Sequence, residues 1–366
     1  MSSPLSNPAA HNVDGTNVPC AVGIDSLYIS SFIDGLGIDW EMLRYEREKL
    51  RADSAVEYAK VELGGETFAL KRYGAKPYSF VLVNKAFELR LGESIHPRCH
   101  VRFSSEVLWL LGLNEAWKRY NAIWDRIGCK QMRPEKIARV DAAFDFPIGK
   151  PNFTVDHFLS RAQKDCEWRE SGELQSIQFG TSDIVVRVYD KVAEIEQASA
   201  KHWMFDLWGT NSGVFRIEFQ IRTEALGKAG IETVEQMRAY LPGLIRHLAK
   251  AHTSLRIPNA DSNRSRWPMH PLWDSLIAST DELTTAPDIP PRPFQRGSLY
   301  SIERQLQSMM GDMKGLAATL SRNCPDRPVT LEQLMQWLPR MMRRHHSPLL
   351  WDPDVREKIR RRELGL

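Results

Sequence analysis

Three features that mark whole classes of protein are missing from this sequence of 366 residues. No apolar run approaches the ~20 residues that a membrane-spanning helix needs, so we expect no transmembrane segment. The N-terminus has no basic stretch followed by an apolar core, so we expect no secretory signal. The five cysteines are odd in number and form no Cys-X-X-Cys pair, which predicts reduced thiols and a cytoplasmic protein.

A strong net charge is also absent, because 49 Lys and Arg nearly balance 46 Asp and Glu to give +3. This balance does not by itself indicate a nucleic-acid partner. The charge is uneven, however: from Arg292 onward, 14 basic residues against 8 acidic ones give +6. We expect a disordered tail at 1–19, a folded domain at 20–280, a proline-rich linker at 281–296 and a basic helical region at 297–366. That last region is interpreted as a binder of duplex DNA, a site for a partner helix, or a solvated appendage.

The stretch 176–191 predicts a β-hairpin around which the chain is organised. Residues 176–179 and 184–191 are rich in strand formers, and 180–183 supply turn residues. In the second strand, Arg187, Tyr189 and Lys191 point to one face. Cations beside a phenol favour its ionised form and attract phosphate, which makes this face a candidate site.

Two further strands, 136–146 and 214–222, also alternate between apolar and charged residues. If the three strands share a sheet, their polar side chains gather on one face. That set is Arg139, Asp141, Asp145, Arg187, Tyr189, Lys191, Arg216 and Glu218. A second interpretation stays open, in which these are solvated outer faces joined by cross-strand salt bridges.

Helices are expected at 39–53, 105–126, 154–168, 191–200 and 232–252. Ser104 or Ser105 is the expected cap of the second helix and Gly128 its end, and Thr154 is the expected cap of the third. Asp190 is a plausible cap of the fourth helix, which explains why it breaks the alternation of its strand. Three more helices are expected at 298–321, 330–345 and 354–364.

Five motifs, in order and spacing, resemble those of the trans-acting rolling-circle replication initiators. These are Rep proteins of plasmids and filamentous phages, with related relaxases of conjugative elements. The motifs are Arg139-Val-Asp-Ala-Ala-Phe-Asp145, Arg187-Val-Tyr-Asp-Lys191, Arg216-Ile-Glu-Phe-Gln-Ile-Arg222, and stretches at 23–30 and 262–273. The resemblance covers roughly residues 20–280. It implies an α+β fold, a mainly antiparallel sheet with helices packed on one face, to which a C-terminal helical appendage is added. The alternation along the strands agrees, because parallel sheets favour continuous apolar strands.

The resemblance implies that Tyr189 is a nucleophile that nicks DNA, leaving a 5′-phosphotyrosine and a free 3′-hydroxyl. The chain lacks the His-hydrophobic-His motif that another rolling-circle family uses for its metal. Mg²⁺ or Mn²⁺ would therefore be held by carboxylates, namely Asp141, Asp145 and Glu218. Arg187 and Lys191 would steady the phosphate or phenolate. Two other roles stay open, Asp145 as an orienting group and Lys191 as a structural cation.

DNA contacts are expected from two sets of residues. The first set is Arg139, Arg216 and Arg222 on the charged strand faces. The second is Arg264, Arg266 and Trp267, where cations alternate with tryptophans in a pattern that suits nucleic-acid strands. The second set fits equally well a surface loop anchored by buried tryptophans.

The partner implied by the resemblance is origin DNA, single-stranded or in a hairpin. A host helicase or polymerase and a homodimer are further partners that the family suggests, and no membrane is involved. Three alternatives stay open. They are a relaxase that starts conjugative transfer, a non-catalytic DNA-binding protein of the same fold, and a metal-dependent phosphohydrolase that uses water as its nucleophile.

Overall fold

The computed structural model describes residues 18–284, 299–321, 328–345 and 348–364. The chain divides into two compact units, 1–291 and 292–366, which are described separately here. The expected tail at 1–19 falls almost wholly outside the described residues. The expected linker at 281–296 does so from residue 285 onward, and its first residues belong to the 3₁₀ turn η4 (Ser279–Thr284).

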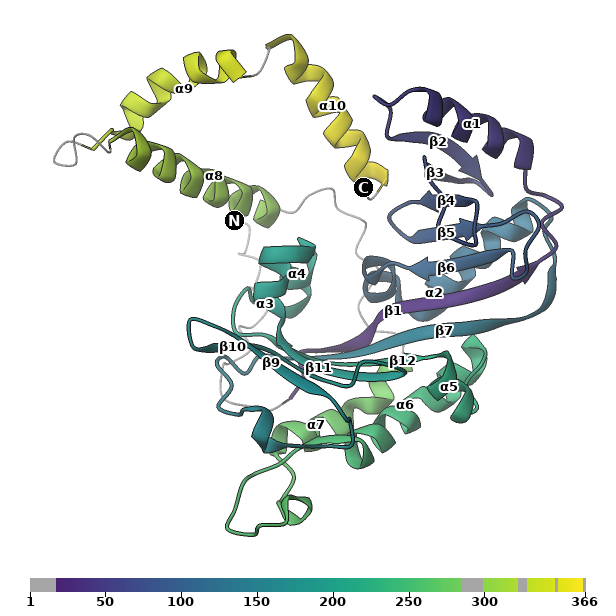
Figure 1. Ribbon diagram of the computed structural model, residues 1–366, viewed down its shortest axis with the longest axis vertical. Coiled ribbons are helices and arrows are strands. Elements are labelled where there is room, and N and C mark those ends of the chain that lie inside the picture. The colour runs from purple at the N-terminus through teal and green to yellow at the C-terminus, as the bar shows by residue number, and fades with distance from the viewer. Residues whose placement is uncertain (1–17, 285–298, 322–327, 346–347, 365–366) are drawn as a thin grey trace, which may run out of the picture. The chain divides into compact units, whose positions relative to one another are not determined.

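The first unit is built on an eleven-stranded sheet in the order β2-β3-β4-β5-β6-β1-β7-β12-β11-β10-β9 (Figure 1). Every neighbouring pair in this sheet is antiparallel. The strands are β1 (Ala21–Ile33), β2 (Tyr58–Leu63), β3 (Glu66–Lys71), β4 (Phe80–Val83), β5 (Phe87–Leu91), β6 (Cys99–Phe103), β7 (Gln131–Phe146), β9 (Asp165–Glu170), β10 (Glu173–Phe179), β11 (Ile184–Asp190) and β12 (Phe215–Arg222). A small second sheet pairs β8 (Phe158–Ser160) with β13 (Thr253–Leu255). The architecture is therefore the α+β class that was expected.

Helices lie on both sides of the half of the sheet that carries the charged motifs (Figure 1). Figure 1 shows α5, α6 and α7 below strands β9 to β12, whereas the short α3 and α4 stand above them. The helices of this unit are α1 (Trp40–Ala52), α2 (Ser105–Arg126), α3 (Lys191–Glu194), α4 (Trp203–Trp208), α5 (Thr223–Lys228), α6 (Val234–Ala251) and α7 (Pro271–Ala278). Ser104 caps α2 by accepting a hydrogen bond from the Val107 amide, as expected.

Every second residue of β12 is apolar, which explains why this strand lies in the middle of the core. Phe215, Ile217, Phe219 and Ile221 all point to the covered face and are buried. The ring of Phe219 lies 6.2 Å from that of Trp273 in α7, whose indole N–H donates to the Ala249 carbonyl at 2.8 Å. Burial of each such side chain stabilises the fold by roughly 1.5–3 kcal/mol. The packing of the apolar face of β12 therefore fixes the position of the charged side chains on its other face.

The three strands that carry the charged motifs are confirmed. Residues 136–146 form the second half of β7, 184–190 form β11, and 215–222 form β12. The helix expected at 154–168 is wrong. A 3₁₀ turn, η1 (Val155–His157), is followed there by β8 and β9. The ring of Phe158 packs 5.0 Å from that of Phe179, and β9 pairs with β10, so tertiary contacts override the local helix signal.

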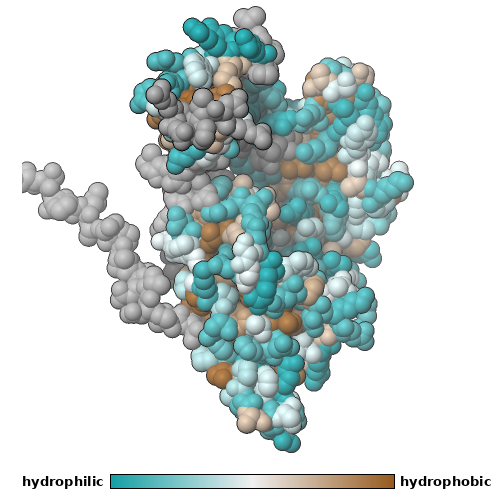
Figure 2. All heavy atoms as spheres, turned by 60° about the vertical axis from the view of Figure 1, so that its left-hand side comes forward, coloured by the Kyte–Doolittle hydropathy of each residue, from teal (hydrophilic) through white to brown (hydrophobic). Residues whose placement is uncertain are grey.

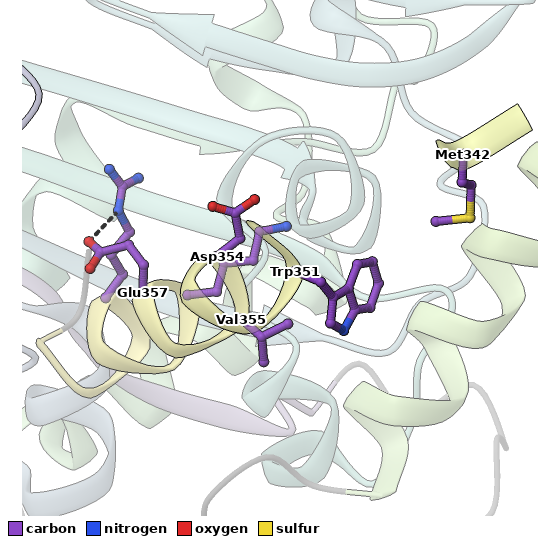
Figure 3. Close-up of a pocket in the computed structure, with 7 residues that line it drawn as sticks. Met342, Trp351, Asp354, Val355 and Glu357 are labelled. Carbon is purple, nitrogen blue, oxygen red and sulfur yellow. Dashed lines mark hydrogen bonds and ion pairs between the residues drawn. The ribbon is translucent and has the colours of Figure 1, made fainter. Parts of the chain in front are cut away.

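The second unit consists of helices α8 (Leu299–Leu320), α9 (Leu331–His345) and α10 (Pro348–Leu364) in its described part. Met342 of α9 and Trp351 and Val355 of α10 line a hollow of about 390 Å³ (Figure 3). Along α10, Arg361 pairs with Glu357 at 3.4 Å.

The molecular surface carries hydrophobic side chains in small groups among hydrophilic ones, as the face in Figure 2 shows. None of the helices in the described part of the chain combines the length and hydrophobicity that crossing a bilayer requires.

Candidate active site

The polar faces of β7, β12 and β11 meet in two cross-strand rows. In one row, Tyr189 lies opposite Arg216, which lies opposite Asp145. In the next row, Arg187 lies opposite Glu218. Residues directly opposite each other share one face of a sheet, so the strand alternation has brought these side chains together as predicted.

Tyr189 is held by a hydrogen bond to a carboxylate. Its hydroxyl donates to Glu218 Oε2 at 3.1 Å, while Arg187 Nη1 donates to Glu218 Oε1 at 2.9 Å. The Lys191 ammonium lies 5.6 Å from the centre of the Tyr189 ring. Burial and the charge of Glu218 raise the pKa of Tyr189 well above its usual range, against the opposing effect of Arg216. The phenol is therefore neutral here, and Glu218 is placed to take its proton.

The half-buried Tyr189 faces a pocket of about 550 Å³. Strand β10 and the edge strand β9 form one wall of this pocket, and α3 and the π-helical turn η2 (Ile195–Ser199) form the other. Asp190 caps α3 by accepting from the Ala193 amide at 2.9 Å, as its position in the sequence predicted. π-helical turns are rare overall, and those that occur are often found at functional sites. Here the turn η2 lines the pocket.

Arg216 is fully buried between two carboxylates. It donates to Asp145 Oδ1 through Nε at 2.6 Å and to Asp145 Oδ2 through Nη2 at 2.8 Å, and to Asp25 Oδ1 through Nη1 at 2.6 Å. The guanidinium has no exposed surface, which is at odds with the expectation that Arg216 contacts DNA. Its place under the site makes it a structural cation that fixes the strand bearing Glu218.

Asp145 was expected to bind metal, but both of its oxygens are already engaged. They accept from Arg216 and from Trp208 Nε1 of α4, the latter at 2.9 Å, and the side chain is completely buried. This arrangement matches the alternative in which Asp145 orients its neighbours. Trp208 was not among the predicted residues.

Asp25 is a further buried carboxylate of the site, which strand alternation did not predict. It accepts from Ser105 Oγ at 2.8 Å, Trp109 Nε1 at 3.0 Å and Arg216, and Lys201 Nζ lies 3.4 Å away. Burial by itself would raise the pKa of Asp25. The positive charges of Arg216, Lys201 and Lys191 outweigh it and hold this pKa well below its usual range. A break in the register of β1 between Ile24 and Ser26 accounts for the omission, because strict alternation fails at a bulge.

Lys191 is almost fully buried at the start of α3 and pairs with Glu194 Oε2 at 2.5 Å. Burial and the nearby Arg216 lower its pKa. The ammonium group lies near the Tyr189 ring but has little exposed surface to offer a phosphate.

Asp141 lies beside Glu218 on the same face and is paired with Arg139. Arg139 donates through Nε at 2.8 Å and through Nη2 at 2.5 Å. Burial raises the pKa of Asp141 to about 6 although Arg139 opposes this, and the charge of Glu218 adds to the increase. Two neighbouring carboxylates that repel each other attract a cation.

A divalent ion fits a smaller ligand set than the one predicted. Among residues 18–284 and the other described ranges, no group of three or more His, Cys, Asp or Glu side chains is placed to hold an ion. Asp141 and Glu218 are the remaining carboxylates on this face, and each would exchange an arginine contact to hold Mg²⁺, which is commonly bound through one or two carboxylates and several waters. Gln220 lies opposite Asp141, and its buried Nε2 has no hydrogen-bond partner among the described residues. This amide N–H is a donor, so an acceptor such as a phosphate oxygen would satisfy it, whereas a metal ion would not.

The raised pKa of Asp141 predicts how stability depends on pH in the absence of divalent ions. Between pH 3.8 and about 6 the folded protein holds a proton on Asp141 that the unfolded chain has lost. The free energy of unfolding therefore falls as pH rises through this window, by about 3 kcal/mol for this group. Urea unfolding should show that the free energy of unfolding of Asp141→Asn, relative to that of the wild type, is about 3 kcal/mol higher at pH 7 than at pH 4. A wild-type-to-variant difference that stays constant between the two pH values would contradict the assignment.

The remaining predicted DNA contacts lie elsewhere. Arg222 is exposed at the end of β12, opposite Arg139. Arg264 donates to the Phe158 carbonyl at 2.7 Å and stacks on Trp267, whose indole N–H donates to the Asp261 carbonyl. Only Arg266 of this second set is strongly exposed, at 71% of its side chain. The loop precedes α7, and Figure 1 shows it below the sheet, on the side opposite to α3 and α4. The structure does not bring this set to Tyr189.

Comparisons with known proteins add little. No protein-family model matches the sequence, and no curated protein matches it. Among solved structures, the chain is similar to a rolling circle replication initiator protein from Geobacillus stearothermophilus, with 18% identity and a TM-score of 0.44. The likeness covers 73% of this chain and 99% of that one. A TM-score this low carries no argument about function.

Proposed function

We propose that this protein initiates rolling-circle replication by nicking one DNA strand at an origin through tyrosine transesterification. The observation that carries the proposal is the phenol of Tyr189, which faces a pocket and donates to Glu218 at 3.1 Å. A phenol with a raised pKa needs a base beside it to act as a nucleophile, and Glu218 is such a base. Arg187, with 31% of its side chain exposed, is placed to bind a phosphate oxygen.

The proposed reaction exchanges one phosphodiester for another. The Tyr189 hydroxyl gives its proton to Glu218 as its oxygen forms a bond to phosphorus. The bond from phosphorus to the 3′ oxygen breaks, and that oxygen takes a proton from water and leaves as a free 3′-hydroxyl. Asp141 and Glu218 would hold Mg²⁺ or Mn²⁺, which when bound supplies positive charge at the scissile phosphate. Arg187 then exchanges its contact with Glu218 for one with the phosphate.

Covalent trapping tests the proposal. The wild-type protein is mixed with supercoiled DNA of its own replicon and Mn²⁺, and separately with EDTA. We expect a protein–DNA adduct on denaturing gels that needs the metal ion, and mass spectrometry should place the nucleotide on the peptide containing Tyr189. Cleavage without an adduct would favour the water-based phosphohydrolase. Binding without cleavage of DNA known to carry the cognate origin would favour the non-catalytic alternative.

The same chemistry serves a relaxase, so a positive result leaves replication and conjugative transfer to be separated by genetics. Deleting the gene from its replicon distinguishes them. Loss of the replicon is expected for an initiator, whereas retained replication with lost transfer indicates a relaxase.

A further inference from the structure

The pocket beside Tyr189 contains a slot that the proposed reaction leaves unexplained. Trp168 of the edge strand β9 lies opposite Ser176 of β10, and Ser176 lies opposite Tyr189 of β11. The three residues form one row, and all three line the pocket. A small side chain between two aromatic ones leaves a hollow with Ser176 as its floor.

The dimensions of this slot suit one planar ring. Trp168 and Tyr189 are two strand spacings apart, or about 9.5 Å. Stacked rings lie about 3.4 Å apart, so one base between two rings needs about 6.8 Å and fits, whereas two bases would need about 10.2 Å and do not. Trp168 is 50% exposed, so part of its ring is accessible to a ligand.

Away from Arg187, the charged side chains of the pocket favour an uncharged base over a phosphate. Among the residues that line the pocket, Asp190, Glu194 and Glu218 are acidic and Arg187 is the basic one. Gln175, Gln178 and Gln197 also line it, although the Gln178 amide already accepts from Arg187 and donates to the Gly180 carbonyl. An amide offers both a donor and an acceptor, which is what the edge of a base requires.

We propose that this slot takes one unstacked nucleobase, next to the scissile phosphate, with Trp168 as its stacking platform. The proposal rests on the proposed function, since it names the substrate group that positions the phosphate at Tyr189. Stacking on an aromatic side chain is tolerant of sequence, so Trp168 supplies affinity and the glutamine amides supply preference.

Binding is tested without chemistry, in a Tyr189→Phe background. Fluorescence anisotropy with fluorescein-labelled oligothymidylate of 12 nucleotides should show a loss of affinity of about tenfold for Trp168→Ala and near-normal binding for Trp168→Phe. Ser176→Leu, which fills the slot and leaves the tryptophan in place, should weaken binding similarly. Tyr240→Ala is the matched control, because Tyr240 is 56% exposed on α6, outside the pocket, and its variant should bind normally. Unchanged binding by Trp168→Ala, or an equal loss in the control, would overturn the proposal.

A second experiment separates this proposal from the proposed function. An abasic site is placed in turn at each position flanking the nick in an origin oligonucleotide, and adduct formation is measured with Tyr189 intact. One position should be sensitive in the wild type and insensitive in Trp168→Ala. Normal nicking by Trp168→Ala with unchanged position dependence rejects the slot and keeps the nickase. Weakened binding by Trp168→Ala without any adduct from the wild type keeps the slot and rejects the nickase.

Discussion

Tyr189→Phe is expected to remove the covalent adduct completely and to lower strand cleavage by on the order of 10⁴-fold or more. Losses of this size follow when a catalytic nucleophile is deleted, because no neighbouring group replaces it. The substitution removes one hydroxyl and its hydrogen bond to Glu218, so the sheet and the pocket stay in place. The measurement is the rate of nicking of supercoiled DNA, with adducts counted on denaturing gels.

The control for this substitution is DNA binding by the same variant, which should stay within a few-fold of the wild type. Tyr240→Phe serves as a matched control for loss of a tyrosine hydroxyl far from the pocket. A Tyr189→Phe protein that still cleaves at the wild-type rate would exclude tyrosine transesterification.

Arg216→Ala is expected to lower the free energy of unfolding by about 3–5 kcal/mol. The guanidinium neutralises Asp25 and Asp145, and its removal leaves both carboxylates buried without their shared cation. Domains of ordinary stability have about 5–15 kcal/mol in total, so the variant should unfold at a much lower urea concentration. Circular dichroism across a urea series measures the loss.

Arg266→Ala is the control for the arginine substitution. Arg266 pairs with Asp261 at 3.5 Å on an exposed loop, and exposed pairs contribute about 0–1 kcal/mol. If Arg216→Ala were no more destabilising than Arg266→Ala, the buried network would have no stabilising role.

The strands and their polar faces were predictable because apolar and polar residues alternate along each of them in the sequence. The alternation in β7 and β12 placed Asp141, Glu218 and their neighbours on one face, and the register brought them beside Tyr189. Alternation gives the face of a residue but not its depth. Arg216 and Asp145 lie on the predicted face, yet Trp208 and Asp25 close over them. No local pattern in the sequence indicates that these two residues would cover the site.

The other differences have equally specific causes. Asp25 was missed because a bulge interrupts β1 just where it enters the site. Trp168 was placed on a helix that does not exist, and its exposure at the edge of the sheet depends on the pairing of β9 with β10. Both are consequences of long-range pairing, which a single strand cannot encode.

The order of strands gives the site a gradient of local stability. Strands β7 and β12 lie in the interior of the sheet with partners on both sides, whereas β9 is its last strand and has a partner on one side only. Interior strands open by near-global unfolding, while edge strands and short turns open at low cost in free energy. Tyr189 and Glu218 therefore belong to the part of the sheet in which we expect slow amide hydrogen exchange. Trp168 belongs to the part that opens locally at low cost in free energy. Under the proposed function, a strand of DNA would be admitted and released by opening the edge hairpin, without disturbing Asp141 and Glu218.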